Sequence, residues 1–242
     1  MNAFLNNMSI RNRMALSVLL FMVVFLFAMY NAWHTIEANI AFSAQEEKGN
    51  TYQRPLAQLL YDAGRLRVAL GGARAGSDTR SDVTALIPAI DGHMAALKEA
   101  QAAVGEDLQF TKDGLGSRGR ENLAYEAVLQ KWQGISDAVK ANIIGGHDEA
   151  VASFIADIRG MVAHSGDTSN LILDPDLDSY YLMDITLLAL PQTLDRLSVI
   201  GSMVYPRLLR DVELEAGEKT QMAVMSHSLR ESDIDRITAA LE

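Results

Sequence analysis

The sequence has no cysteine and few residues that break helices. Because no cysteine occurs among the 242 residues, disulfides and metal sites built on thiolates are excluded. Five prolines and 17 glycines are too few for an extended low-complexity protein. With 49% hydrophobic residues, the chain is long enough for one large domain or two small ones with a proper core.

Basic residues are scarce as well. The chain has 21 Lys and Arg against 31 Asp and Glu, which gives a net charge of −10. Nucleic-acid binding requires clustered Lys and Arg to neutralise phosphates. We therefore expect no nucleic-acid partner.

One apolar segment near the N-terminus is long enough to cross a membrane. Residues 14–29 read MALSVLLFMVVFLFAM, with Ser17 as the only clearly polar residue, and residues 30–33 extend the segment. Twenty helical residues at about 1.5 Å each span about 30 Å of hydrocarbon. Tyr30 and Trp33 are the aromatic residues expected at the far interface. The sequence therefore predicts a transmembrane helix.

The flanks of this segment predict its orientation. Arg11 and Arg13 precede it, and no acid occurs before Glu37, so the N-terminus is expected in the cytoplasm. A cleaved signal peptide is the alternative, but the segment is long for one and no small-x-small cleavage site follows cleanly. We predict a cytoplasmic N-terminus (1–13), a transmembrane helix (14–33) and an acidic extracytoplasmic helical domain (34–242), single-pass as given.

The rest of the chain shows helical periodicity and no strand-like alternation. Apolar residues that recur at spacings of three and four align on one face of a helix. Such faces are formed by Leu56, Leu59, Leu60, Ala63, Leu66 and Leu70; by Leu86, Ile87, Ile90, Met94 and Leu97; by Val151, Phe154, Ile155, Ile158 and Val162; and by Leu177, Tyr181, Leu182, Ile185, Leu188, Leu194, Leu197, Ile200 and Val204. The fold class is all-α: a transmembrane helix followed by an elongated antiparallel helical bundle.

Turn residues place the first helix boundaries. The first helix is expected to run from the membrane to about Gly71-Gly72, with a kink at Pro55. A second helix is expected after a cap at Ser77 or Ser81. Residues 105–117 read as a loop from their glycine and charge content.

The remaining boundaries follow in the same way. A third helix is expected over 118–144, and a fourth from a cap at Asp148 to near Gly166. A long helix is expected from an N-cap at Asp174, with Pro175 at its first position and Asp176 in its first turn, and with bends at Pro191 and Pro206. Residues 212–242 form the last helix. Six helices of unequal length leave open two stacked four-helix modules or one bundle with an inserted hairpin.

The sequence contains no constellation typical of an enzyme. Its five histidines, His34, His93, His147, His164 and His227, lack the spacing of a helical zinc site. Phosphate-binding loops and serine-hydrolase elbows are absent. The alternating acids Asp174, Asp176 and Asp178 resemble a calcium loop, but Ser179 stands at its glycine position and Ile185 at its final glutamate position. Neither catalytic activity, a metal nor a cofactor is expected.

Four residues are candidates for a small-ligand site between helices. Arg65 and Arg67 lie on the first helix, and Asp178 and Tyr181 on the long one. Arginine binds carboxylates through paired hydrogen bonds, and interhelical clefts commonly hold ligands. The alternative is structural, because arginines on amphipathic helices usually pair with surface acids and tyrosines at core spacing usually pack in the core.

Two sequence segments resemble a known family. The membrane helix, FSAQEEKGNTYQRPLAQLL (residues 42–60) and SNLILDPDLDSYYLMD (residues 169–184) are similar to the N-terminal part of bacterial methyl-accepting chemotaxis receptors, over most of residues 10–205. The resemblance implies a homodimer in the bacterial inner membrane whose periplasmic or extracellular domain senses a small molecule or a periplasmic binding protein. Similar modules also precede histidine kinases and diguanylate cyclases.

The same family implies segments that this sequence does not contain. Receptors of this family share a second membrane helix, a HAMP linker and a cytoplasmic signalling hairpin. By this resemblance, we expect these 242 residues to be part of a longer receptor. The leading hypothesis is the sensory input region of a chemotaxis receptor. The alternatives are the input region of a kinase or cyclase, and a membrane-anchored helical scaffold that senses nothing.

Overall fold

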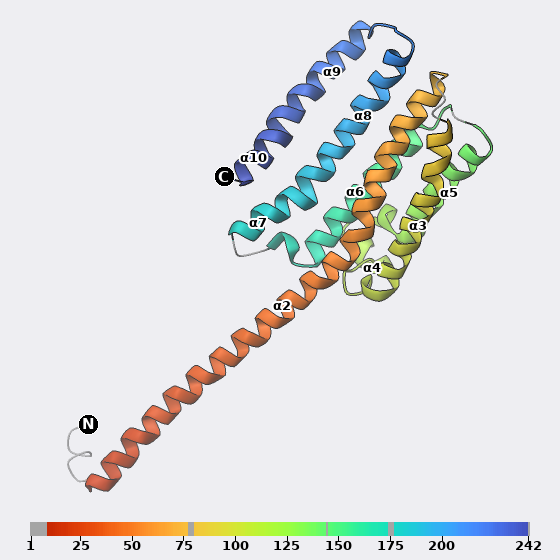
Figure 1. Ribbon diagram of the computed structural model, residues 1–242. Coiled ribbons are helices and arrows are strands. Elements are labelled where there is room, and N and C mark those ends of the chain that lie inside the picture. Colours follow the sequence, from red (N-terminus) through yellow and green to blue (C-terminus); the bar gives the residue numbers. More distant parts are fainter. Residues whose placement is uncertain (1–8, 77–79, 144, 174–176, 242) are drawn as a thin grey trace. The chain divides into compact units, whose positions relative to one another are not determined.

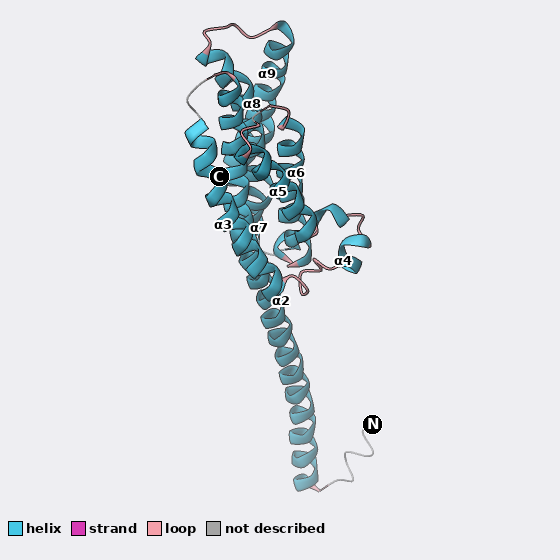
Figure 2. Cartoon of the chain, turned by 90° about the vertical axis from the view of Figure 1, so that its right-hand side faces the viewer, coloured by secondary structure: helices cyan, strands magenta, loops and turns pink. Residues whose placement is uncertain are grey.

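The computed structural model describes residues 9–76, 80–143, 145–173 and 177–241, and these ranges contain helices and no strand (Figure 2). The chain divides into two compact units, Met1–Ala44 and Gln45–Glu242. One helix, α2 (Ile10–Arg74), belongs to both and is 65 residues long. The prediction of an all-helical protein is confirmed.

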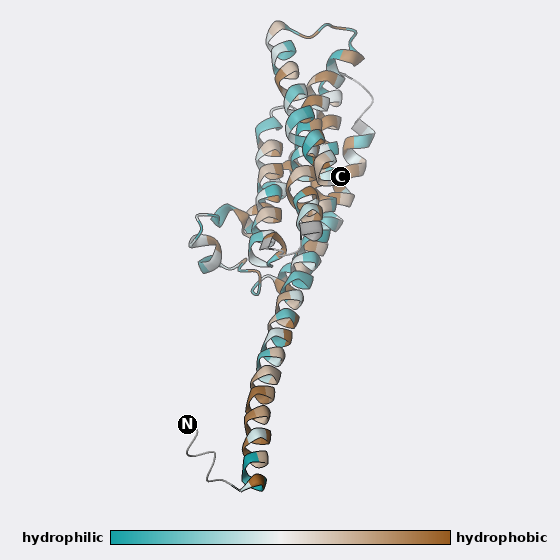
Figure 3. Cartoon of the chain, turned by 90° about the vertical axis from the view of Figure 1, so that its left-hand side faces the viewer, coloured by the Kyte–Doolittle hydropathy of each residue, from teal (hydrophilic) through white to brown (hydrophobic). Residues whose placement is uncertain are grey.

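The first unit contains the candidate membrane segment. Within the described residues, α2 is the one helix long and apolar enough to cross a membrane, and none of its most apolar 18 residues is buried. The hydropathy colouring shows consecutive apolar turns in this part of α2 (Figure 3). This is consistent with a single membrane anchor, since apolar side chains exposed on all sides of a helix need a lipid or protein environment.

The second unit is built around a core of four helices. The end of α2 packs with α3 (Arg80–Val104), α5 (Tyr125–Lys140) and α6 (Asp148–Thr168), whose apolar side chains form one buried cluster. All the core residues predicted on these helices from residues 56–70, 86–97 and 151–162 are buried. The periodicity of the sequence thus identified the three core faces correctly, because each is a continuous stripe.

Aromatic side chains fill the centre of this core. The rings of Trp132 and Phe154 stack with their centroids 5.7 Å apart, and the indole Nε1 donates to Asp91 Oδ1 at 2.6 Å. The ring of Tyr52 stacks on Phe110 at 4.2 Å, and its hydroxyl donates to Gln101 Oε1 at 2.7 Å. Burial raises the pKa of Tyr52 far above its usual value, so this hydroxyl remains a hydrogen-bond donor.

Two further helical segments form a hairpin against this core. The first consists of α7 (Leu177–Met183), a π-helical turn η3 (Asp184–Ala189) and α8 (Leu190–Leu209). The second consists of α9 (Ala216–Ser228), a π-helical turn η4 (Leu229–Ile234) and α10 (Asp235–Leu241). In Figure 1, α8 and α9 lie side by side with opposite chain directions.

The hairpin is much less buried than the four-helix core. No residue of α9 is buried, and Leu197, predicted as core, is 46% exposed. Of the core face predicted from residue 177 onward, only Ile185 is fully buried among the residues described. The prediction of a full core face was wrong here because the neighbouring helices leave parts of α7 and α8 uncovered, including Leu182 and Leu197.

Several predicted boundaries were also wrong. The third helix begins at Tyr125 rather than near Arg118, after a 3-10 turn, η1 (Glu121–Leu123). The predicted loop 105–117 contains a short helix, α4 (Lys112–Gly116), because Thr111 caps it: its hydroxyl accepts from the Gly114 amide at 3.1 Å.

Two predicted caps do not cap their helices. Asp148 is the first residue of α6, and its carboxylate pairs with Arg74 instead. Ser81 lies within the first turn of α3. The predicted caps Ser77 and Asp174 lie outside the described residues, as do Pro175 and Asp176.

Candidate functional site: a groove between three helices

A groove of about 400 Å³ lies between α2, α3 and α8 in the second unit. Its walls are mostly apolar, with polar groups at a few positions, as is typical of small-ligand sites. It is lined by Leu60, Tyr61, Gly64, Arg65, Val68 and Ala69 from α2, by Asp82 and Leu86 from α3, and by Leu194, Leu197, Ser198 and Tyr205 from α8.

Small residues bring α2 and α8 close together beside this groove. A Cβ atom at Gly71 would lie 2.8 Å from the backbone oxygen of Ser202, and one at Gly201 would lie 2.8 Å from Val68 Cγ2. At Gly64, a Cβ would lie 3.4 Å from the Ser198 Cβ. From Gly64 to Gly71, the contacted residues of α8 advance from Ser198 to Ser202. The two helices are therefore parallel. Any displacement of α2 along α8 must change these contacts, because the interface has little free space.

Arg65 is the predicted site residue that the structure places in the groove. Its Nη1 donates to Asp62 Oδ1 at 3.1 Å, and its guanidinium lies 5.6 Å from the centroid of the Tyr61 ring. The other carboxylate oxygen of Asp62 lies 3.2 Å from His93 Nε2. Asp62 is buried, whereas the Arg65 side chain is 57% exposed. The positive charge of Arg65 is thus already compensated.

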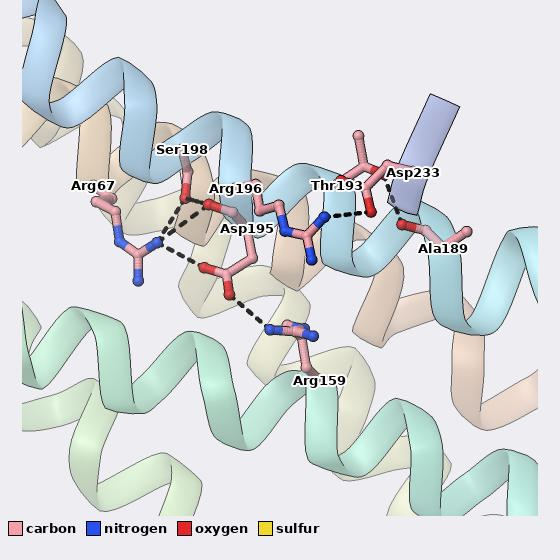
Figure 4. Close-up of polar contacts among 8 residues, drawn as sticks. All are labelled: Arg67, Arg159, Ala189, Thr193, Asp195, Arg196, Ser198 and Asp233. Atoms are coloured by element: carbon pink, nitrogen blue, oxygen red, sulfur yellow. Dashed lines mark hydrogen bonds and ion pairs between the residues drawn. The ribbon is translucent and has the colours of Figure 1, made fainter. Parts of the chain in front are cut away.

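Arg67 does not face this groove but is buried in a polar network (Figure 4). Its Nη1 donates to Asp195 Oδ1 at 2.7 Å and to Ser198 Oγ at 2.8 Å. The second oxygen of Asp195 accepts from Arg159 Nη1 at 2.7 Å. One carboxylate on α8 therefore ties together α2 and α6. Two guanidinium groups share it, so each charge is only partly compensated.

Tyr181, another predicted site residue, is not among the residues that line the groove. Tyr181 is 39% exposed, and its ring packs edge-on against Tyr180 with centroids 5.9 Å apart. The side chain of Asp178 lies outside the part of the chain that the structure describes. The three candidates whose side chains are described, Arg65, Arg67 and Tyr181, thus do not form one site.

Two ion pairs connect the helices of the hairpin at their π-helical turns. Arg196 on α8 donates to Asp233 in η4 at 2.8 Å, and Arg236 on α10 forms two hydrogen bonds to Asp184 in η3. Asp233 is 1% exposed and its Oδ2 has no hydrogen-bond partner within the described chain. π-helical turns within helices are frequent at functional sites, and here each contains a carboxylate that binds the other segment of the hairpin.

A buried histidine lies elsewhere in the four-helix core. His164 is completely buried, with its ring 4.5 Å from that of Phe110 and its Nδ1 3.2 Å from Arg120 Nη1. Burial and, secondarily, the positive charge of Arg120 lower the pKa of His164. The ring is therefore held neutral. No cavity adjoins it among those described.

The described residues contain no group of three or more His, Asp or Glu side chains that could hold a metal ion. Other cavities are lined by described residues, and one of about 580 Å³ is formed by α3 and the end of α5. It includes Asp91 and Lys140, whose charged groups lie 4.0 Å apart. The groove is distinguished from these cavities by its two tyrosines and by its position on the helix that contains the apolar segment.

Sequence reasoning missed most polar residues of the groove and of the network. Asp62 carried a signal, because it lies three residues after Leu59 and four before Leu66, on a face that is otherwise apolar. An acid on a core face indicates a buried partner. Asp82, Ser198 and Tyr205 carried no such signal, because their role depends on how α3 and α8 are placed beside α2.

Comparison with protein-family models finds no match, and neither curated proteins nor solved structures match the chain. The class of protein therefore follows from the fold alone. The protein is helical, with a bundle unit and, in the part of the chain that the structure describes, one candidate membrane-spanning helix.

Proposed function

We propose that the chain is the sensory input region of a transmembrane receptor and that the groove between α2, α3 and α8 binds its ligand. One observation carries this proposal. The helix that contains the candidate membrane segment, α2, also supplies six of the residues that line the groove. A ligand in the groove would therefore contact the helix that enters the membrane.

The contacts of α2 with α8 support a mechanism of transmission. Helix displacements of about 1–2 Å are common in receptors and allosteric proteins, and packed interfaces change between discrete arrangements. The close approach at Gly71 and the pair between the buried Arg67 and the partly exposed Asp195 define one such arrangement. A ligand that binds better to a second arrangement shifts the population toward it by its difference in affinity.

The resemblance to methyl-accepting chemotaxis receptors supports the finer assignment. In this proposal the N-terminus is cytoplasmic, and the second unit lies in the periplasm or outside the cell. The receptor acts as a homodimer in the bacterial inner membrane, and its output is chemotaxis, with a kinase or cyclase as the alternative output. The exposed apolar residues of α8 and α9 also fit a second stacked four-helix module completed by further helices.

A thermal-shift screen of small metabolites tests ligand binding on the full chain in lipid nanodiscs. A ligand at about 100 times its dissociation constant stabilises the folded state by about 2.7 kcal/mol. The variant Leu197→Trp places a large ring at the groove, and Leu208→Trp is the matched control because Leu208 is exposed on the same helix outside the groove.

We expect at least one metabolite to raise the unfolding midpoint of the wild type and of Leu208→Trp but not of Leu197→Trp. A scaffold that senses nothing predicts no metabolite-dependent shift in any of the three. A shift that Leu197→Trp retains would place the ligand elsewhere and contradict the assignment of the groove.

A further inference from the structure

The charges that line the groove indicate the class of its ligand. We propose that the groove binds an amphipathic amine, whose ammonium pairs with Asp82 and whose apolar body lies against α2 and α8. This inference rests on the proposed function, since it names the ligand of the same groove.

The first step is the balance of charge. Arg65 and Asp82 are the two charged residues of the lining. Arg65 is already paired with Asp62, which also contacts His93. Asp82 has neither an ion pair nor a hydrogen bond to its carboxylate within the described residues and is exposed. Asp82 lies in the first turn of α3, where the helix dipole favours a negative charge. Among the described side chains, no basic group neutralises this carboxylate, so the charge that the groove offers to a ligand is negative.

The second step is the chemistry of the walls. Leu86, Leu194 and Leu197 form an apolar surface, and Leu197 is 46% exposed, so part of this surface is accessible to a ligand. Tyr61 and Tyr205 add two aromatic rings. Aromatic faces attract cations and also pack against apolar groups. A carboxylate, aromatic rings and apolar walls together suit a cation with an apolar body better than an anion.

Two effects disfavour a ligand of the opposite charge. Arg65 already donates to the buried Asp62, so a carboxylate ligand would have to share this guanidinium with a second negative charge. Such a ligand would also bring its negative charge toward Asp82, in a protein of net charge −10. Both effects oppose anion binding and favour cation binding.

The test is calorimetric titration of the full chain in lipid nanodiscs with 2-phenylethylamine as the probe. The comparison compounds are 2-phenylethanol, which lacks the charge, 3-phenylpropionate, which reverses it, and phenylalanine, which has both charges. The variants are Asp82→Asn, Asp82→Glu and the matched control Glu99→Gln, since Glu99 is exposed on the same helix away from the groove.

We expect the amine to bind more tightly than the alcohol or the carboxylate. Asp82→Asn should weaken its binding about tenfold, as for a hydrogen bond to a charged group. Asp82→Glu should retain most of the affinity, and Glu99→Gln all of it. Because Asp82 is exposed, these substitutions leave the core intact, and circular dichroism confirms the fold of each variant.

Two results would overturn the inference. The first is equal loss of amine binding in Asp82→Asn and Glu99→Gln, which would indicate a general charge effect. The second is that 3-phenylpropionate binds more tightly than 2-phenylethylamine, or that phenylalanine does so with an affinity that Asp82→Asn leaves unchanged. If the amine fails to bind while a metabolite still shifts the wild type and not Leu197→Trp, the ligand class is wrong and the sensory function stands. If no metabolite produces a shift, both proposals fall.

Discussion

The substitution Asp195→Asn tests the polar network that joins α2, α6 and α8. It removes the charge that compensates Arg67, which is 7% exposed, while it keeps the shape of the side chain. Loss of one partner from a fully buried pair costs about 3–5 kcal/mol. Arg159 is about one-third exposed and water can solvate it, so we expect a loss of about 2 kcal/mol. For a unit of this size the unfolding midpoint should fall by about 4–8 °C.

The assay is thermal unfolding of the full chain in lipid nanodiscs, followed by circular dichroism. Asp137→Asn is the matched control, since Asp137 is exposed on α5 and has no ion pair among the described residues. The double variant Arg67→Met, Asp195→Leu removes both charges and should be more stable than Asp195→Asn. An unfolding midpoint of Asp195→Asn within the error of the Asp137→Asn value would refute the reasoning.

Two further predictions concern stability. Gly71→Ala should lower the unfolding free energy by about 1–3 kcal/mol, because its Cβ would meet the Ser202 backbone. The control is Gly92→Ala, which should raise the unfolding free energy by about 0.5–1 kcal/mol, because no atom lies within 4 Å of the added Cβ. Equal effects of the two substitutions in denaturant titrations would contradict the close approach of α2 and α8. The pKa of His164 is lower in the folded chain than in the unfolded chain. Below about pH 6.5, the unfolded chain therefore binds a proton at His164 that the folded chain does not bind, and this difference favours unfolding. The unfolding midpoint should therefore fall from pH 7 to pH 5, and less steeply in His164→Gln than in His227→Gln.

The parts of the fold that sequence reasoning predicted well are those where one helix has one continuous apolar face. On α2 every predicted core residue from Leu56 to Leu70 is buried. The hairpin was predicted less well, because periodicity shows that a face is apolar and not whether a neighbour covers it. The π-helical turn η3 could not be anticipated, although Pro191, which follows it, was recognised as a disturbance: proline cannot donate a hydrogen bond to the preceding turn.

The site was predicted in part, for a related physical reason. Arg65 and Arg67 are two residues apart and therefore point in different directions on a helix. One faces the groove and the other lies in the buried network with Asp195. Sequence alone gave both the same weight, since their roles depend on the partner helix. The placement of Asp82 on the wall of the groove depends on the packing of α3 against α2, which no local pattern encodes.

The central claim is that a ligand in the groove shifts α2 relative to α8. Because the chain has no cysteine, spin labels can be attached to introduced cysteines alone, at Gln58 on α2 and Leu208 on α8, both exposed and outside the groove. The distance between the labels is then measured by electron–electron double resonance in nanodiscs, with and without a metabolite that stabilises the wild type. We expect this distance to change by about 1–2 Å when the metabolite binds, and Leu197→Trp should abolish the change. An unchanged distance with the metabolite bound would contradict the central claim.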